Sequence, residues 1–106
     1  MDTPKVLTRD EALDLVRAYK QVISPRFNDQ AKVFMFGSYS KGYANPWSDI
    51  DVAVIVPHVD EDKWLETSVA LGYDVDKVSM LIEPVLLEEN HWSPLYDDVM
   101  RTGIAV

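Results

Sequence analysis

The stretch Ser48-Asp49-Ile50-Asp51-Val52-Ala53-Val54-Ile55-Val56 contains the clearest strand of the chain, a β-branched run over residues 50–56 closed by Pro57. Asp49 and Asp51 stand where this strand starts. Alternate residues of a strand point to the same face, so the two carboxylates share one side, about 6.6 Å apart at their backbones. Two anions held this close need a neutralising charge. Mg²⁺ suits them, because it takes oxygen ligands and is commonly held by one or two carboxylates.

A glycine–serine turn precedes this strand. The apolar run over residues 31–36 predicts a buried strand that stops at Gly37, and Ser38 then opens a short helix. Backbone N–H groups and the helix dipole at such a turn attract an anion. Gly37 permits close approach of a phosphate, the Ser38 hydroxyl can donate to it, and Lys41 adds a cation one turn further on. Taken alone, the Gly37-Ser38 loop would be interpreted as a simple strand-to-helix turn, and Asp49 and Asp51 as two solvated carboxylates. Both features together, at this spacing, favour a site for phosphate and metal.

Capping and turn residues predict the other elements. Thr8 followed by Glu11 is a capping-box pattern for a first helix over residues 9–24. Residues 78–87 predict a third strand, in which Pro84 indicates an edge or a bulge. Ser93-Pro94 opens a last helix, which stops at Gly103.

A further helix is expected between the second and third strands. Asp60 can cap it, and it extends to about residue 71, with Gly72 leaving its end open. Its inner face is expected to consist of Trp64, Leu65, Val69 and Leu71. The order helix, strand, strand, helix, strand, helix predicts an α+β fold in two layers, a small sheet covered by helices mainly on one face.

Composition limits the possible partners. A chain of 106 residues with 47% hydrophobic content is expected to form one domain, residues 1–106. The net charge of −8 argues against long nucleic acid as a partner, because nucleic-acid binders usually carry a basic stripe. A basic protein or divalent cations suit this charge better, and solubility alone explains it equally well.

Other features of the composition bear on location and chemistry. No apolar run approaches the roughly 20 residues of a membrane span, and residues 1–6 lack a signal-peptide pattern, so we expect no membrane partner and a cytoplasmic location. The absence of cysteine excludes disulfides, Cys-ligated zinc and thiol nucleophiles.

Gly37-Ser38, ten intervening residues and Asp49-Ile50-Asp51 resemble the signature of the DNA polymerase β-type nucleotidyltransferase superfamily, and more closely its minimal nucleotidyltransferases. The resemblance implies that superfamily's small mixed sheet and a third carboxylate on a neighbouring strand, at the position of Glu83. The family often has Asp there, so Glu83 is a departure. Lys41 stands where the family frequently has Arg, and lacks the planar fork of a guanidinium.

The same resemblance implies an enzymatic function. Two Mg²⁺ ions held by Asp49, Asp51 and Glu83 would serve transfer of a nucleoside monophosphate, AMP from ATP, to a hydroxyl group with release of pyrophosphate. Gly37, Ser38 and Lys41 would grip the triphosphate. Small members of the family often pair with HEPN-type ribonuclease toxins as their antitoxins, so a HEPN-type protein is the expected partner. A non-catalytic antitoxin and a small-molecule nucleotidyltransferase stay open as alternatives, as does a homo-oligomer.

Overall fold

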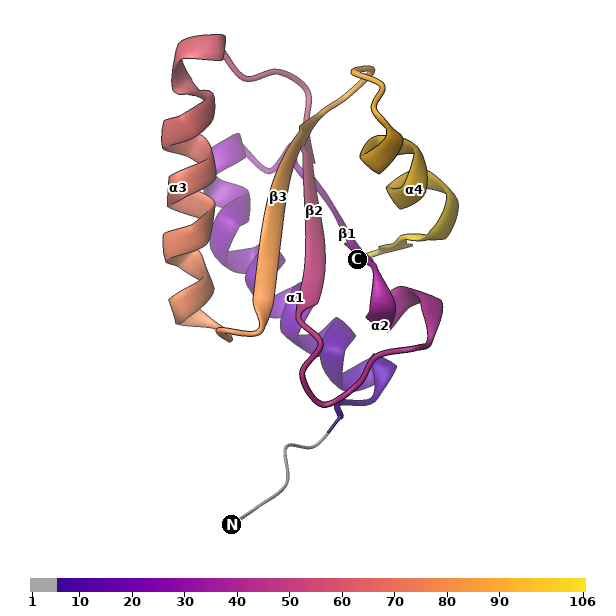
Figure 1. The fold of residues 1–106 in the computed structure, drawn as a ribbon. Coiled ribbons are helices and arrows are strands. Elements are labelled where there is room, and N and C mark those ends of the chain that lie inside the picture. The colour runs from indigo at the N-terminus through magenta and orange to yellow at the C-terminus, as the bar shows by residue number, and fades with distance from the viewer. Residues whose placement is uncertain (1–5) are drawn as a thin grey trace.

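The computed structural model describes residues 6–106. Residues 1–5 lie outside the described residues; they belong to the expected single domain and to the segment 1–6 that is expected to lack a signal-peptide pattern. Figure 1 shows a central sheet with helices on both sides. The elements in chain order are α1 (Arg9–Ile23), η1 (Ser24–Phe27), β1 (Lys32–Phe36), α2 (Ser38–Lys41), β2 (Ile50–Val56), η2 (Glu61–Lys63), α3 (Trp64–Asp74), η3 (Val75–Lys77), β3 (Ile82–Glu88), α4 (Pro94–Thr102) and β4 (Ile104–Ala105).

The sheet is mixed and has the strand order β3-β2-β1-β4. β1 runs antiparallel to both β2 and β4, whereas β2 and β3 are parallel. The parallel pair requires a crossover connection, and α3 supplies it. β2 lies inside the sheet and is buried from Val52 through Val56, in agreement with its unbroken apolar run. The α+β class predicted from the sequence is therefore confirmed.

The helices cover the two faces of the sheet unequally. α1 and α3 pack on one face, where Ile50, Val52, Val54 and Val56 of β2 join the main core. The shorter α4 packs on the other face, over a second cluster that includes Ala53 and Ile55. Alternation along β2 separates these two sets of side chains. Because Asp51 has the parity of Ala53 and Ile55, it belongs to the α4 face.

Several predicted boundaries are confirmed and one is shifted. The Thr8 side chain accepts from the Glu11 backbone N–H at 3.0 Å, and the reciprocal bond of the capping box is also present. Ser93 caps α4, which ends at Gly103. β3 begins at Ile82 rather than at residue 78, because η3 and the turn after it use the preceding residues. Pro84 lies on an edge strand, where its missing N–H is tolerated.

The expected inner face of α3 is wrong. Leu71 is buried, but Leu65 and Val69 are 74% and 46% exposed, and Trp64 is 36% exposed. The helix continues through Gly72 to Asp74, and its buried side is set by Leu71 and Asp74. Asp60 makes no capping bond and contacts His58 instead. No helix within residues 6–106 is long and apolar enough to cross a membrane.

A buried ion pair joins α3 to η1. The Asp74 side chain is 2% exposed, and its carboxylate accepts from Arg26 Nε at 2.5 Å and from Arg26 Nη2 at 3.0 Å. Lys77 Nζ donates to the same carboxylate at 3.1 Å. Hydrogen bonding from Arg26 is the main reason why the pKa of Asp74 lies below its usual value. The crossover helix is thus anchored by charge as well as by the apolar core.

We expect Arg26→Ala to lower the free energy of unfolding by about 2 kcal/mol, because it leaves the buried Asp74 carboxylate with Lys77 alone. Asp74→Asn should cost less, because it leaves no buried charge. The lowered pKa of Asp74 stabilises the fold above the unfolded-state pKa, and this stability is lost as the pH falls through the folded-state value. Urea unfolding of the three proteins at pH 7 and pH 3 measures both effects. An equal loss in the free energy of unfolding for Arg26→Ala and Asp74→Asn at pH 7 would contradict the expected difference between the two variants.

Candidate active site

The register of the sheet brings the predicted carboxylates to one place. Asp51 lies opposite Phe36 of β1 and directly beside Glu83 of the parallel strand β3. Asp49 comes two residues before Asp51, at the entrance to β2. Figure 1 shows that β2 and β3 begin at the end of the sheet where α2 follows β1. Glu83, which lies more than 30 residues further along the chain, therefore meets Asp49 and Asp51 at one end of the sheet.

Gly37 forms the turn that faces Asp51. Its φ of 75° and ψ of −148° lie in a region that side chains other than glycine's rarely adopt. A Cβ atom built at this position would lie 2.1 Å from Oδ2 of Asp51, far inside contact distance. The Asp51 carboxylate thus occupies the space that only a glycine leaves open.

The other predicted phosphate ligands lie on α2. This helix has a single turn, so its dipole is small, and a phosphate there would depend mainly on nearby N–H groups. Ser38 is its first residue, and its hydroxyl makes no hydrogen bond within the part of the chain that the structure describes. Arg9 of α1 donates to the carbonyls of Tyr39 and Ser40, at 3.4 and 3.1 Å, and so fixes α2 against α1.

The pKa values of Asp51 and Glu83 are both raised, in each case with a contribution from the charge of Asp49. Burial, followed by the charge of Asp49, raises the pKa of Asp51, and the charge of Lys41 lowers it in part. The charge of Asp49 and then hydrogen bonding with Asp49 raise the pKa of Glu83, with a smaller effect from Asp51. Glu83 is exposed, on an edge strand, yet it lies close enough to Asp49 to interact with it. The cluster therefore carries more negative charge than Lys41 compensates.

The donor set fits a divalent cation. Carboxylate oxygens are the ligands that Mg²⁺ prefers; burial and then the charge of Asp49 raise the pKa of Asp51, and the charge of Asp49 raises the pKa of Glu83, so a cation would favour the ionised forms of both. Across residues 6–106, no three Asp, Glu, His or Cys side chains are already gathered into a metal cage. Asp49 and Glu83 are exposed and able to change rotamer toward Asp51. The assignment of these three residues as metal ligands stays a prediction.

Lys41 has a partner that the sequence does not indicate. Its Nζ atom donates to Oδ2 of Asp98, on α4, at 3.1 Å. Asp98 therefore lies at the border of the carboxylate cluster and competes with a phosphate for the Lys41 ammonium. No motif or spacing marks Asp98, because its position depends on how α4 packs across the sheet.

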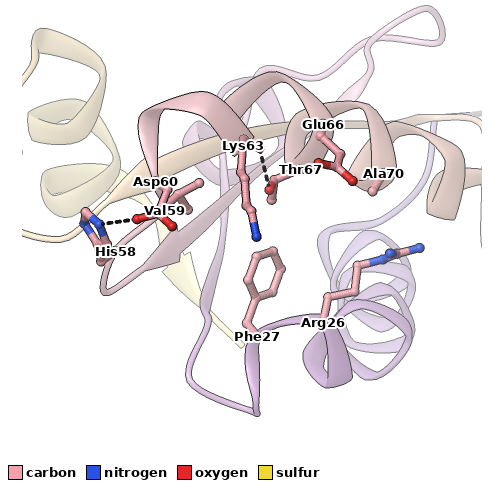
Figure 2. Close-up of a pocket in the computed structure, with 9 residues that line it drawn as sticks. All are labelled: Arg26, Phe27, His58, Val59, Asp60, Lys63, Glu66, Thr67 and Ala70. Carbon is pink, nitrogen blue, oxygen red and sulfur yellow. Dashed lines mark hydrogen bonds and ion pairs between the residues drawn. The ribbon is translucent and has the colours of Figure 1, made fainter.

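A separate surface pocket lies at the opposite end of β2. Its volume is about 390 Å³, and it is lined by residues of η1, of the loop after β2 and of α3. Figure 2 shows the Phe27 ring and the Lys63 side chain pointing toward each other across it, with His58 and Asp60 at one side. The pocket contains none of the predicted site residues, which are Gly37, Ser38, Lys41, Asp49, Asp51 and Glu83.

Removing one charge from the carboxylate cluster is expected to stabilise the metal-free protein. A pKa raised by folding means that the ionised group costs stability at neutral pH, and that this cost falls as the pH drops through the folded-state value. We expect Asp51→Asn to raise the free energy of unfolding by about 0.5–1 kcal/mol at pH 8, a shift of about 2–6 °C in Tm.

Thermal unfolding in EDTA at pH 8 and pH 5 measures this effect. The advantage of Asp51→Asn should shrink at pH 5, because the wild-type carboxyls are then closer to protonation. Lower stability of the variant at both pH values would mean that the carboxylates are not in repulsive contact.

Comparison with known proteins identifies the family of the chain. The family model described as "Nucleotidyltransferase domain" matches residues 16–103. The "Putative protein adenylyltransferase MJ0141" of Methanocaldococcus jannaschii is 27% identical over 99 residues, which cover 91% of this chain and 99% of that protein.

Solved structures share the fold. The crystal structure of a "putative nucleotidyltransferase" from Sulfolobus solfataricus superposes with a TM-score of 0.63 at 18% identity, covering 98% of this chain and 90% of that one. A toxin–antitoxin structure with AMP-PNP superposes with a TM-score of 0.50 at 22% identity, covering 93% of this chain and 72% of that one. With the family model matching most of its length, the chain belongs to the nucleotidyltransferase domain family.

Proposed function

We propose that this nucleotidyltransferase moves AMP from ATP to a hydroxyl group of a partner protein in the cytoplasm and releases pyrophosphate. The observation that carries the proposal is the meeting of Asp49, Asp51 and Glu83 beside the Gly37 turn. The name of the M. jannaschii relative supports protein adenylylation, because the two chains align over nearly their whole lengths.

The proposed reaction assigns a role to each side chain. Asp49, Asp51 and Glu83 would hold Mg²⁺, which when bound neutralises the triphosphate and lowers the pKa of the acceptor hydroxyl. The Gly37 turn and the free Ser38 hydroxyl orient the phosphates. Lys41 leaves Asp98 and binds a phosphate oxygen as a point charge.

Bond changes in the transfer balance without a further reactant. The acceptor oxygen forms a bond to the α-phosphorus, and the bond from that phosphorus to the bridging oxygen of the leaving pyrophosphate breaks. The hydroxyl proton passes to the carboxylate of Asp51 or Glu83. Pyrophosphate leaves, and AMP stays on the acceptor.

The exposure of the cluster favours a macromolecular acceptor. Asp49 and Glu83 are both exposed, so the acceptor hydroxyl reaches them from solvent rather than from an enclosed cavity. A hydroxyl on the surface of another protein meets this requirement. We propose a HEPN-type toxin as that protein, in keeping with the toxin–antitoxin complex among the proteins of the same fold.

Incubation with α-labelled ATP, Mg²⁺ and a candidate HEPN-type protein tests the proposal. Label on the HEPN-type protein that is lost with EDTA is the expected result. Label on neither protein, with Mg²⁺–ATP binding intact by calorimetry, would contradict protein adenylylation while leaving the nucleotide site standing.

One structural observation favours a second function, an antitoxin that acts by binding alone. Lys41 is engaged with Asp98, and Glu83 interacts with Asp49, so both groups are occupied without substrate. A binding-only antitoxin would protect cells from the toxin equally well after Asp51→Asn. Loss of protection in that variant, with binding to the toxin unchanged, would exclude this alternative.

A further inference from the structure

The outer side of α3 carries an apolar stripe that the core does not use. Leu65, Val69 and Tyr73 follow one another at four-residue spacing and are 74%, 46% and 73% exposed. Residues at this spacing lie on one side of a helix. Leu71, by contrast, is buried against the sheet, so the stripe points away from the core. Figure 1 shows α3 at the left edge of the molecule, outside the sheet.

The stripe is unusual for a surface that contacts only water. Single exposed apolar residues need no explanation, but a contiguous group of them on one helix marks an interaction site. The stripe extends over nine residues, from Leu65 to Tyr73, about 12 Å along the helix axis. Gly72 lies beside the stripe and is exposed, and a Cβ atom added there would meet no neighbouring atom within 4 Å. Glycine within a helix nevertheless lowers the stability of the helix by about 1 kcal/mol relative to alanine.

Most of the charged side chains near the stripe are negative. Asp62 in η2 and Asp76 in η3 lie just before and just after the stripe, and Glu66 follows Leu65 within α3. None of these three carboxylates has a hydrogen-bond or ion-pair partner within residues 6–106. The two lysines nearest in sequence make no ion pair with them within residues 6–106: Lys77 binds Asp74, and Lys63 and Glu66 both line the pocket of Figure 2.

We propose that the outer side of α3 is a docking surface for an amphipathic helix of another protein, one whose apolar stripe is flanked by lysine or arginine. Apolar side chains at four-residue spacing form a ridge on α3 that can pack against the apolar side of a second helix. The negative charges near the stripe select basic flanks on that helix. A second copy of this chain fits poorly, because it would bring two negatively charged surfaces together, in two molecules that each have a net charge of −8.

The docking surface is separate from the carboxylate cluster. α3 packs on the face of the sheet that contains Ile50 and Val52, whereas Asp51 belongs to the α4 face. A partner bound to α3 therefore leaves Asp49, Asp51 and Glu83 open to nucleotide and acceptor. This inference stands whether or not the chain adenylylates a protein.

Titration of the ¹⁵N-labelled protein with a synthetic helical peptide tests the surface. The probe carries leucines at positions i, i+4 and i+8 with lysines on both sides, and a matched peptide carries glutamates in place of the lysines. We expect the amide shifts caused by the lysine peptide to concentrate in residues 62–76, and the glutamate peptide to cause none of comparable size.

A double variant and a matched control identify the side chains responsible. Leu65→Ser with Val69→Ser should raise the Kd for the lysine peptide at least about tenfold. Met100→Ser, which removes a 44% exposed apolar side chain from α4, should leave it unchanged. The amide spectrum itself shows whether each variant is folded.

Three results would overturn the proposal. The first is equal binding by the double variant, and the second is a set of shifts centred on the carboxylate cluster. The third is a concentration-dependent shift of residues 62–76 without peptide, which would identify a second copy of this chain as the occupant.

Discussion

Nucleotidyl transfer by Asp51→Asn is expected to fall on the order of 10³-fold or more, because the substitution removes one carboxylate from a group that acts as a unit. Asp51 lies beside Glu83 in register, and its pKa responds to both Asp49 and Lys41. Asparagine keeps the shape of the side chain but not its charge. The measurement is the initial rate of label transfer from α-labelled ATP to the partner protein at saturating Mg²⁺.

The same variant supplies its own control for folding. Because burial and then the charge of Asp49 disfavour the ionised form of Asp51, Asp51→Asn should be at least as stable as the wild type without metal, and a loss of activity would then not come from unfolding. Activity within roughly tenfold of the wild type, a difference of only about 1.4 kcal/mol in the barrier, would reject Asp51 as a metal ligand.

Gly37→Ala is expected to reduce transfer on the order of 10²-fold, because the added methyl group displaces the Asp51 carboxylate. The Cβ atom would lie 2.1 Å from Oδ2 of Asp51, and the φ of 75° at this position is unfavourable for alanine. We also expect the free energy of unfolding to fall by about 1–3 kcal/mol. Transfer assays together with urea unfolding measure both losses.

Gly72→Ala is the matched control, since it adds the same methyl group elsewhere. Gly72 is exposed within α3 and has nothing within 4 Å of the position of a Cβ atom. Alanine there should raise the free energy of unfolding by about 0.5–1 kcal/mol and leave transfer unchanged. Unaltered transfer by Gly37→Ala would show that the turn does not position Asp51.

Local signals were sufficient for much of the fold. The strand predicted at residues 50–56 has the observed bounds of β2, because an unbroken β-branched run fits only a buried interior strand. Ser93 and Gly103 gave the limits of α4 through capping chemistry that involves only neighbouring residues. The two-residue strand β4 was not predicted, since it is too short to have a periodicity of its own.

Features that depend on tertiary packing were predicted less well. Leu65 and Val69 were assigned to the core because apolar residues on a helix usually face inward, whereas the inner side of α3 includes the charged Asp74. The burial of Asp74 depends on Arg26, which is 48 residues away in the chain.

The candidate site was only partly accessible from the sequence. Asp49 and Asp51 could be paired by the two-residue period of a strand, but the position of Glu83 beside them depends on the register of two parallel strands, which the sequence alone does not set. The assignment of Glu83 to the site came from a family resemblance instead. Asp98 was missed because it reaches Lys41 only through the packing of α4.

The contact between Gly37 and Asp51 also has an evolutionary consequence. A side-chain carbon at position 37 and a carboxylate oxygen at position 51 would claim the same volume, so neither position can change freely while the other is kept. Among descendants of this chain, a larger residue at position 37 should therefore accompany the loss of the acidic residue at position 51. Such paired replacement would mark lineages in which the domain has become a catalytically dead paralogue, and it can be recognised from sequence before any assay.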